Sequence, residues 1–317
     1  MKYRDLGNTG VPVSVVGMGT WQFGGEWGKD FGRNEVNAMF VAAREHGINL
    51  IDTAECYGDH LSEQLIGHAL SSLYPGERDR WFIATKFGHR FTVPFERDQI
   101  WDPDGVAKQL EESLRALRTD YVDLLQFHSG GDDVFDNDSL WEMLARLREQ
   151  GKVRYLGVSI GANTNDYQTS RAPDVGASAI QVVYNRLDRA PEEQVLPLCM
   201  RHGLGVLARV PLASGYLSGK YQPGAVFGET DVRSRHDRER VAARLEEVER
   251  IAREEVPAGI PMAEWALAWC LQHPAVTAVI PGCKNVDQVR SNARAADLAD
   301  LVRDDHPQAV DVESGGV

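Results

Sequence analysis

Short apolar runs alternate with longer segments whose apolar residues recur at helical spacing. A short apolar run predicts a buried strand, and apolar residues at positions i, i+3 and i+4 predict a helix packed on a sheet. The predicted strands are 15–20, 49–53, 81–86, 122–128, 153–159, 179–185, 205–210 and 277–280. Helices are predicted between them, at 62–73, 103–118 and 138–150 among others. Eight strand–helix units predict the α/β class and a (β/α)8 TIM barrel.

Two β-prone runs, 3–6 and 11–15, precede the first predicted barrel strand. Between them lies the sequence Gly7-Asn8-Thr9-Gly10, and Asn and Gly at such a place favour a tight reversal, so we expect an N-terminal β-hairpin. The chain has 317 residues, and α/β barrels often reach this length without dividing into domains. We therefore expect one domain over residues 1–302. Residues 303–317 are polar and aperiodic, and we expect a disordered tail there.

Composition narrows the possible partners and the compartment. The chain has 47 acidic and 34 basic residues, a net charge of −13, which argues against nucleic acid or an anionic membrane as partner. Its N-terminus lacks the apolar core of a signal peptide, and no run approaches the ~18 apolar residues of a membrane span, so we expect a cytoplasmic protein. The four cysteines are scattered, which predicts free thiols and no metal site.

Three consecutive predicted strands end on ionisable residues. Asp52 ends the strand at 49–53, Lys86 ends the next, and His128 ends the third, while Tyr57 follows Asp52 in the loop. Each residue alone has an ordinary explanation, because aspartates cap loops and tyrosines pack in turns. Parallel neighbouring strands, however, bring their C-terminal ends together at one rim of a barrel, where such enzymes place their active sites. The sequence therefore predicts a cluster of these four side chains.

The segment Asp52-Thr53-Ala54-Glu55-Cys56-Tyr57-Gly58, with Lys86 and His128, resembles the aldo-keto reductase family along nearly the whole chain. The resemblance implies that Tyr57 is the proton donor and that Lys86 lowers its pKa. It further implies that Asp52 pairs with Lys86, that His128 hydrogen-bonds a substrate oxygen, and that the N-terminal hairpin closes the barrel floor. A free tyrosine, with a pKa near ~10, is a weak acid at neutral pH, which makes such tuning reasonable.

The same resemblance implies an NADPH/NADP+ site, with NADH less expected. Strand ends would hold the nicotinamide amide, the segment 209–220 the pyrophosphate, and the segment 282–292 the adenosine 2′-phosphate. Three positions depart from the family pattern: Ile160 replaces an asparagine, Arg209 replaces a stacking aromatic residue, and Gly282 stands where some members carry lysine. The implied cofactor residues are Gly19, Thr20, Trp21, Asp52, Ser159, Gln181, Arg209, Pro211, Leu212, Ser214, Lys220, Gly282, Lys284, Gln288 and Asn292.

Four further segments carry structural expectations. Trp21, Phe23 and Trp27 form either a loop core or a substrate wall, and the pattern does not separate the two. The long connection 87–101 is expected to supply pocket walls through its aromatic residues, Phe91, Phe95 and Trp101. The acidic stretch 132–138 is expected to be a solvated loop, and the basic stretch 233–240 a solvated helix start.

These observations favour an NAD(P)H-dependent enzyme that reduces an aldehyde or ketone, or oxidises the alcohol, by direct hydride transfer. A small carbonyl compound or sugar is the expected substrate. The alternative is a cofactor-binding regulatory or redox-sensing subunit with little turnover, because a shared fold does not settle function. The physiological substrate, the reaction direction and the oligomeric state are not readable from the sequence.

Overall fold

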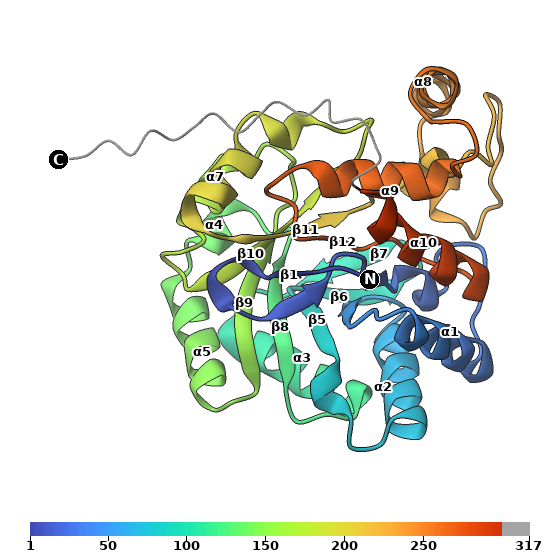
Figure 1. Cartoon of the computed structure of the whole chain (residues 1–317). Coiled ribbons are helices and arrows are strands. Elements are labelled where there is room, and N and C mark those ends of the chain that lie inside the picture. Colours follow the sequence, from blue (N-terminus) through green and yellow to red (C-terminus); the bar gives the residue numbers. More distant parts are fainter. Residues whose placement is uncertain (300–317) are drawn as a thin grey trace.

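The computed structural model describes residues 1–299, and the tail expected at 303–317 falls outside them. Eight parallel strands form one curled sheet in the order β12-β11-β10-β9-β8-β5-β4-β3 (Figure 1). Parallel bridges from Val16 to Val279 and from Gly19 to Gly282 join its two edges. The predicted α/β barrel is confirmed. Its strands are β3 (Met18–Gly19), β4 (Leu50–Asp52), β5 (Phe82–Phe87), β8 (Val122–His128), β9 (Val153–Ser159), β10 (Ala177–Val183), β11 (Gly205–Arg209) and β12 (Ala278–Val279).

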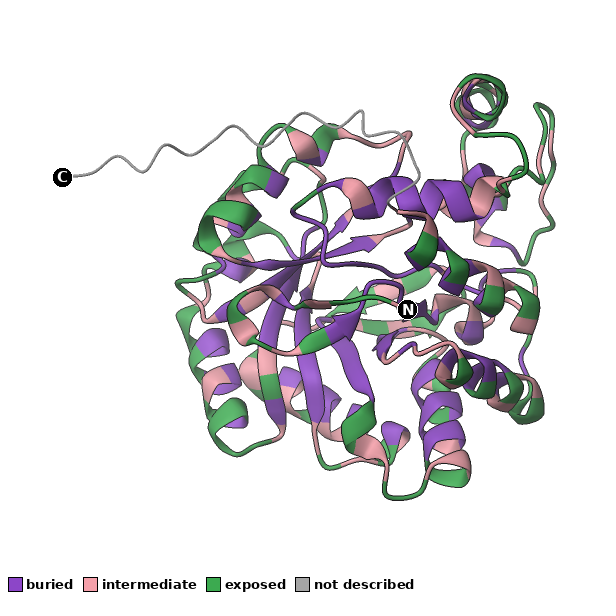
Figure 2. Ribbon diagram, viewed as in Figure 1, coloured by how far each residue is buried: buried purple, intermediate pink, exposed green. Residues whose placement is uncertain are grey.

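Helices surround the sheet and turn their apolar faces toward it, as the predicted spacing requires (Figure 2). The helices predicted at 62–73, 103–118 and 138–150 begin and end within one residue of these positions. No helix in residues 1–299 has the length and apolar character needed to span a membrane. The helices are α1 (Arg33–Glu45), α2 (Leu61–Leu73), α3 (Pro103–Leu117), α5 (Asp138–Glu149), α6 (Asp166–Arg171), α7 (Val195–His202), α8 (Arg238–Glu254), α9 (Met262–Gln272) and α10 (Val286–Leu298).

The predicted N-terminal hairpin is present. Strands β1 (Tyr3–Asp5) and β2 (Pro12–Ser14) pair antiparallel, with Arg4 opposite Val13. Leu6 and Val13 are fully buried in a small cluster that also contains Leu50, Leu124 and Leu207 from the barrel strands. The hairpin therefore closes the end of the barrel opposite the C-terminal ends of the strands.

Two segments differ from their expected loops. The connection 87–101 is a second hairpin, in which β6 (His89–Val93) pairs antiparallel with β7 (Glu96–Gln99). The acidic stretch begins with a short helix, α4 (Asp132–Phe135), whose Phe135 is buried. Asp132 accepts a hydrogen bond from the buried Gln168 Nε2 at 2.8 Å, so this stretch is attached to the barrel and is not a freely solvated loop.

A buried carboxylate ties together the strands at the hairpin end of the barrel. Asp123, the second residue of β8, accepts from Arg78 at 2.8 Å, from Arg154 at 3.1 Å and from the Ile83 amide at 2.9 Å. Each of the two guanidinium groups also lies 4.1 Å from the centre of the Tyr121 ring. Every oxygen of Asp123 therefore has a donor, and three strands are joined at one point.

Candidate active site

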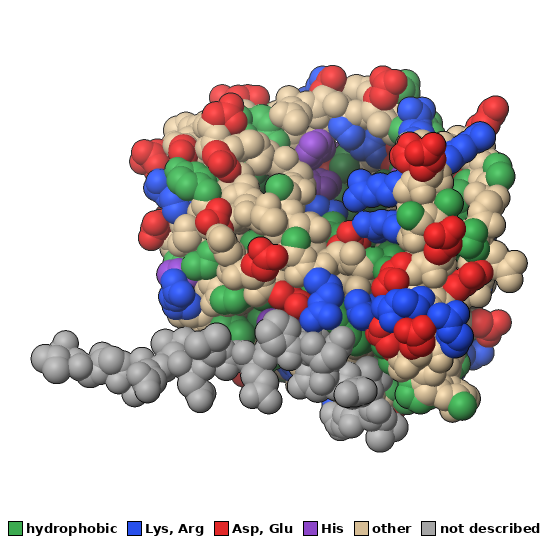
Figure 3. All heavy atoms as spheres, turned by 90° about the horizontal axis from the view of Figure 1, so that it is seen from above, with side chains coloured by type: hydrophobic (Ala, Val, Ile, Leu, Met, Phe, Trp, Pro, Cys, Tyr) green, Lys and Arg blue, Asp and Glu red, His purple; other side chains and the backbone are tan. Residues whose placement is uncertain are grey.

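A cavity of about 900 Å3 opens where the strands end. From above, Lys and Arg side chains border the hollow and histidines lie within it (Figure 3). Asp52, Tyr57 and His128 line the cavity, as the sequence predicts. Lys86, only 1% exposed, lies beside them below the surface. The three consecutive strands thus bring the four predicted side chains together.

Lys86 connects the other charged and phenolic groups of the cluster. Its Nζ donates to Asp52 Oδ1 at 2.7 Å, to the Thr53 carbonyl at 2.7 Å and to the Tyr57 hydroxyl at 3.2 Å. All three donor positions of the ammonium group are therefore used. The ammonium is held charged by Asp52 and directed at the phenol, and burial of both ions strengthens their attraction.

Asp52 is fixed by two glutamines as well as by Lys86. Gln181 Nε2 donates to Asp52 Oδ2 at 2.7 Å, and Gln126 Nε2 donates to the same oxygen at 3.2 Å. Gln181 also donates to Gln126 Oε1 at 3.0 Å. Gln181 was expected to contact a cofactor, whereas Gln126 was missed. The sequence signal that could have identified Gln126 is a polar residue inside an otherwise apolar strand.

Tyr57 is a weaker acid than the sequence suggests. Burial raises the pKa of Tyr57 to about 12, and the attraction of Lys86 for the phenolate opposes this rise without overcoming it. The expected direction of the lysine effect is thus found, but the net lowering of the pKa is not. The physical reason is that desolvation disfavours the charged phenolate more than one ammonium group stabilises it.

His128 is a neutral imidazole in this setting. Burial, followed by the positive charges of Lys86, His89, Arg209 and Arg97, holds the pKa of His128 well below its usual range. His89 contacts the His128 carbonyl oxygen through Nε2 at 2.6 Å, and their ring centres are 4.8 Å apart. A neutral imidazole can donate one N–H to a substrate oxygen without repelling the neighbouring cations.

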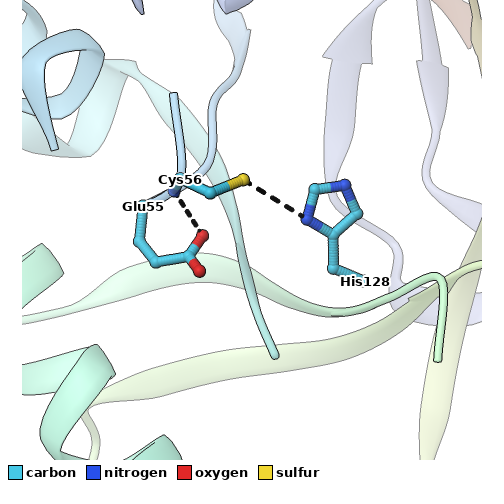
Figure 4. Close-up of side chains that lie close together, drawn as sticks. All are labelled: Glu55, Cys56 and His128. Atoms are coloured by element: carbon cyan, nitrogen blue, oxygen red, sulfur yellow. Dashed lines mark hydrogen bonds between the residues drawn. The ribbon is translucent and has the colours of Figure 1, made fainter. Parts of the chain in front are cut away.

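Glu55, Cys56 and His128 lie close enough for their ligand atoms to share an ion, although the sequence indicated no metal site (Figure 4). Cys56 Sγ is 3.9 Å from His128 Nδ1, and Glu55 accepts the Cys56 amide at 2.6 Å. Burial raises the pKa of Glu55 to about 8, so this carboxyl is protonated at neutral pH. Lys86 and Arg97 are electrostatic neighbours of the thiol. A divalent cation would meet two like charges here, so the cluster does not fit a metal.

The residues implied for the cofactor mostly share the same cavity. All of them line it except Ser159, which is buried with a hydroxyl that lacks a partner among the described residues. Arg209 donates to the Ile160 carbonyl at 3.2 Å, while its Nε has no described partner. The turn after β11 holds Val210, Ala213 and Ser214 at positive φ, a geometry that turns backbone N–H groups toward anions. These unpaired donors and this turn fit a dinucleotide.

The end of the cavity where the cofactor phosphates are expected contains more charged side chains than predicted. Lys284 donates to the Trp27 carbonyl and lies 3.8 Å from Asp231, and burial lowers the pKa of this lysine. Arg233, expected to be part of a solvated helix start, is 6% exposed and pairs with Asp231 at 2.7 Å. Its guanidinium lies 4.1 Å from the centre of the Phe227 ring. The expectation was wrong for Arg233 because Asp231 and Phe227, close in sequence, and Trp27, from the loop after β3, surround its guanidinium.

Glu26 organises the aromatic side of the cavity and was not predicted. This buried carboxylate accepts from Trp21 Nε1 at 2.8 Å, from the Phe95 amide at 2.6 Å and from Arg97. It therefore links the loop after β3 to the β6–β7 hairpin. No local sequence signal marks it, because two of its three partners, Phe95 and Arg97, lie about 70 residues away.

The structure also separates the aromatic residues of these two segments. Trp21, Trp27 and Phe95 line the cavity, whereas Phe23 belongs to the core. Both open interpretations of the first loop are therefore correct for different residues. Phe91 and Trp101 do not line the cavity, so the expectation that they are pocket walls was wrong. Trp101 packs on Phe127 with ring centres 4.7 Å apart, and Arg97 covers Phe91.

Comparisons with known proteins agree with the fold and identify the family. A sequence model of the Aldo/keto reductase family matches residues 15–313. The chain is 30% identical to the NADH-specific methylglyoxal reductase of Escherichia coli, over 94% of each chain. It is 29% identical to a probable voltage-gated potassium channel subunit beta of Arabidopsis thaliana, over 95% of this chain and 93% of that one.

A solved structure extends the likeness to three dimensions. The aldo-keto reductase AKR11C1 from Bacillus halodurans, in its holo form, aligns with a TM-score of 0.77 at 30% identity over 99% of each chain. Family match, barrel and strand-end cluster thus point the same way. The chain belongs to the aldo/keto reductase family of nicotinamide-dependent oxidoreductases.

Proposed function

We propose that the protein reduces an aldehyde or ketone with NADPH, with Tyr57 as the general acid. The observation that carries the proposal is the position of Lys86, whose Nζ contacts both Asp52 and the Tyr57 hydroxyl beside the cavity. When bound, the nicotinamide would supply the hydride, and the protein has to supply orientation and one proton. Residues 1–299 place no other phenol in such a contact with a buried lysine.

The protonation states support this division of roles. With a pKa raised to about 12, the Tyr57 hydroxyl is protonated at neutral pH and can donate to the carbonyl oxygen. The phenolate left behind faces the Lys86 ammonium, which stabilises it. His128, being neutral, donates an N–H to the same carbonyl oxygen and fixes its direction. Trp21 stacks on Tyr57 at 6.0 Å between ring centres and limits access of water.

NADPH is the proposed cofactor because basic side chains gather at the far end of the cavity. Lys220, Arg233 and Lys284 line it there, in a chain whose net charge is −13. Oriented positive charge of this kind favours phosphate groups. One relative is described as NADH-specific, so the choice between the two cofactors requires measurement.

Consumption of NADPH with a panel of aldehydes and ketones tests the proposal, with NADH measured in parallel. Substrate-dependent oxidation of NADPH by the wild-type protein, lost in Tyr57→Phe, is the expected result. The second candidate is a regulatory subunit, which the likeness to a channel β subunit favours. NADPH binding measured by fluorescence quenching, with no turnover of any carbonyl in the panel, would replace the first proposal by the second.

A further inference from the structure

Six basic side chains line the cavity, and five of them have evident roles. Lys220, Arg233 and Lys284 lie at the proposed phosphate end, and Arg209 lies beside the proposed nicotinamide site. Arg97 is neutralised by Glu26. The sixth is Arg235, which has no carboxylate within ion-pair distance among residues 1–299. An exposed arginine at the mouth of a cavity, without a counterion, is available to a ligand.

Arg235 stands on the aromatic side of the mouth. Its guanidinium lies 4.6 Å from the centre of the Phe95 ring, at the tip of the β6–β7 hairpin. Phe95 is held at a positive φ of 72°, and its amide donates to the buried Glu26. Phe95 is thus fixed in place, and Arg235 is directed by its contact with that ring. The contact with Phe95 therefore favours a position of the cation beside the cavity lining.

An aromatic wall connects this position with the reacting centre. Trp21 stacks on Tyr57 with ring planes 22° apart, and Trp27 meets the edge of Trp21 at 5.1 Å between ring centres. Phe95 continues the lining toward the mouth. A ligand whose carbonyl reaches Tyr57 would therefore lie along apolar rings and place its other end toward Arg235.

We propose that Arg235 recognises an anionic group at the far end of the substrate, so that the preferred carbonyl compounds carry a carboxylate on an apolar or aromatic body. The inference rests on the proposed reductase function and names its substrate class. A contact this far from the reacting carbonyl acts equally on the bound substrate and on the transition state. It therefore lowers KM and leaves kcat nearly unchanged.

Two aldehydes that share an aromatic body and differ in the charge of one carboxyl group provide the test: 4-formylbenzoate and its methyl ester, which carries one added methyl group. The ratio of kcat/KM for the acid to that for the ester is measured in the wild-type protein, in Arg235→Ala and in Arg235→Glu. Arg238→Ala is the matched control, because Arg238 is exposed, lies three positions away and does not line the cavity. The Kd of NADPH is measured for every variant.

The wild-type protein is expected to prefer the acid by about 5-fold, the size of an exposed ion pair, and to lose this preference as salt is raised. Arg235→Ala should bring the ratio to about one through KM, Arg235→Glu should reverse it, and Arg238→Ala should keep it. A ratio near one in the wild-type protein, an unaltered ratio in Arg235→Ala, or a weaker NADPH Kd that accounts for the change would each overturn the inference. If the protein reduces other carbonyl compounds of the panel but neither of these two aldehydes, the inference fails alone; if it reduces none of the panel, the proposed function fails first, and the inference fails with it.

Discussion

Two buried aspartates mark opposite ends of neighbouring strands and have different surroundings. Asp123 lies at the start of β8, and Asp52 lies at the end of β4. Both are at most 3% exposed and both are paired with a cation. They differ in the partner, because the Arg154 side chain at Asp123 is 47% exposed, whereas Lys86 at Asp52 is completely buried.

The difference separates an ion pair that joins strands from one that also contacts the Tyr57 hydroxyl. At Asp123, the arginines keep part of their hydration, and every carboxylate oxygen has a donor within the protein, so nothing is left for a ligand. At Asp52, the buried lysine also contacts the Tyr57 hydroxyl, which faces the cavity. Charge at one end therefore holds strands together, and charge at the other contacts the hydroxyl whose proton we propose is transferred. Four substitutions can break or sharpen this contrast.

The largest effect is expected from Tyr57→Phe. The substitution removes the transferable proton and little else, so turnover should fall by ~100-fold or more while NADPH binding and the unfolding midpoint remain unchanged. The matched control at the opposite end is Tyr121→Phe, which should keep wild-type kcat because the Tyr121 ring contacts Arg78 and Arg154 and does not line the cavity. Near wild-type kcat in Tyr57→Phe would remove this tyrosine from the role of acid.

The pH dependence of alcohol oxidation should reveal the role of Lys86. Oxidation requires the Tyr57 phenolate, and because the pKa is raised to about 12, the wild-type rate should still increase beyond about pH 10. Lys86→Met removes the cation that lowers this pKa, so the profile should move to higher pH by about one unit or more. Measurement of kcat/KM against pH with a secondary alcohol checks this, and an unmoved profile would show that Lys86 does not tune the phenol.

The exposure of the Lys284 side chain, 29%, lies between that of Arg154 and that of Lys86. Lys284→Ala should weaken NADPH by about 10-fold, near the lower end of the range for a charge-assisted hydrogen bond, because Trp27 and Asp231 already occupy part of the ammonium. NADH lacks the 2′-phosphate and should bind as before. Lys29→Ala is the control, because Lys29 contacts the Lys284 carbonyl but does not line the cavity.

Titration of both cofactors against wild type and these variants gives the answer for Lys284. An equal loss for NADPH and NADH, or no loss for either, would show that Lys284 does not distinguish the two cofactors. In that case NADH becomes the proposed working cofactor.

The smallest effect on activity is expected from Asp123→Asn. The neutral amide cannot satisfy two arginines as well as a carboxylate does, so the free energy of unfolding should fall by about 1–3 kcal/mol, measured by urea denaturation. Its kcat should stay at the wild-type value, because Asp123 is at the opposite end of the barrel from the cavity. A fall in kcat without a loss of stability would contradict the separation of the two ends.

Local sequence patterns were sufficient to predict the features of the fold and the site whose physical cause is local. The alternation of strand and helix, the hairpin around Asn8 and the order of Asp52, Tyr57, Lys86 and His128 were all readable before the structure. Parallel strands in a barrel must bring their C-terminal ends to one rim, so the sequence order of these residues was enough to predict their proximity.

The tertiary structure decided what depends on distant partners and on burial. Glu26 acquires its role from the hairpin about 70 residues later, and the guanidinium of Arg233 lies 5.5 Å from the centre of the Trp27 ring, which comes from the loop after β3. Phe91 and Trp101 share a segment with Phe95, yet only Phe95 reaches the cavity. The net pKa of Tyr57 also depends on the balance between desolvation and one ammonium group. The sequence by itself determined which groups meet at the rim of the barrel. How those groups behave was decided by their burial and by their neighbours in the tertiary structure, because burial and neighbours depend on distances that no local sequence pattern encodes.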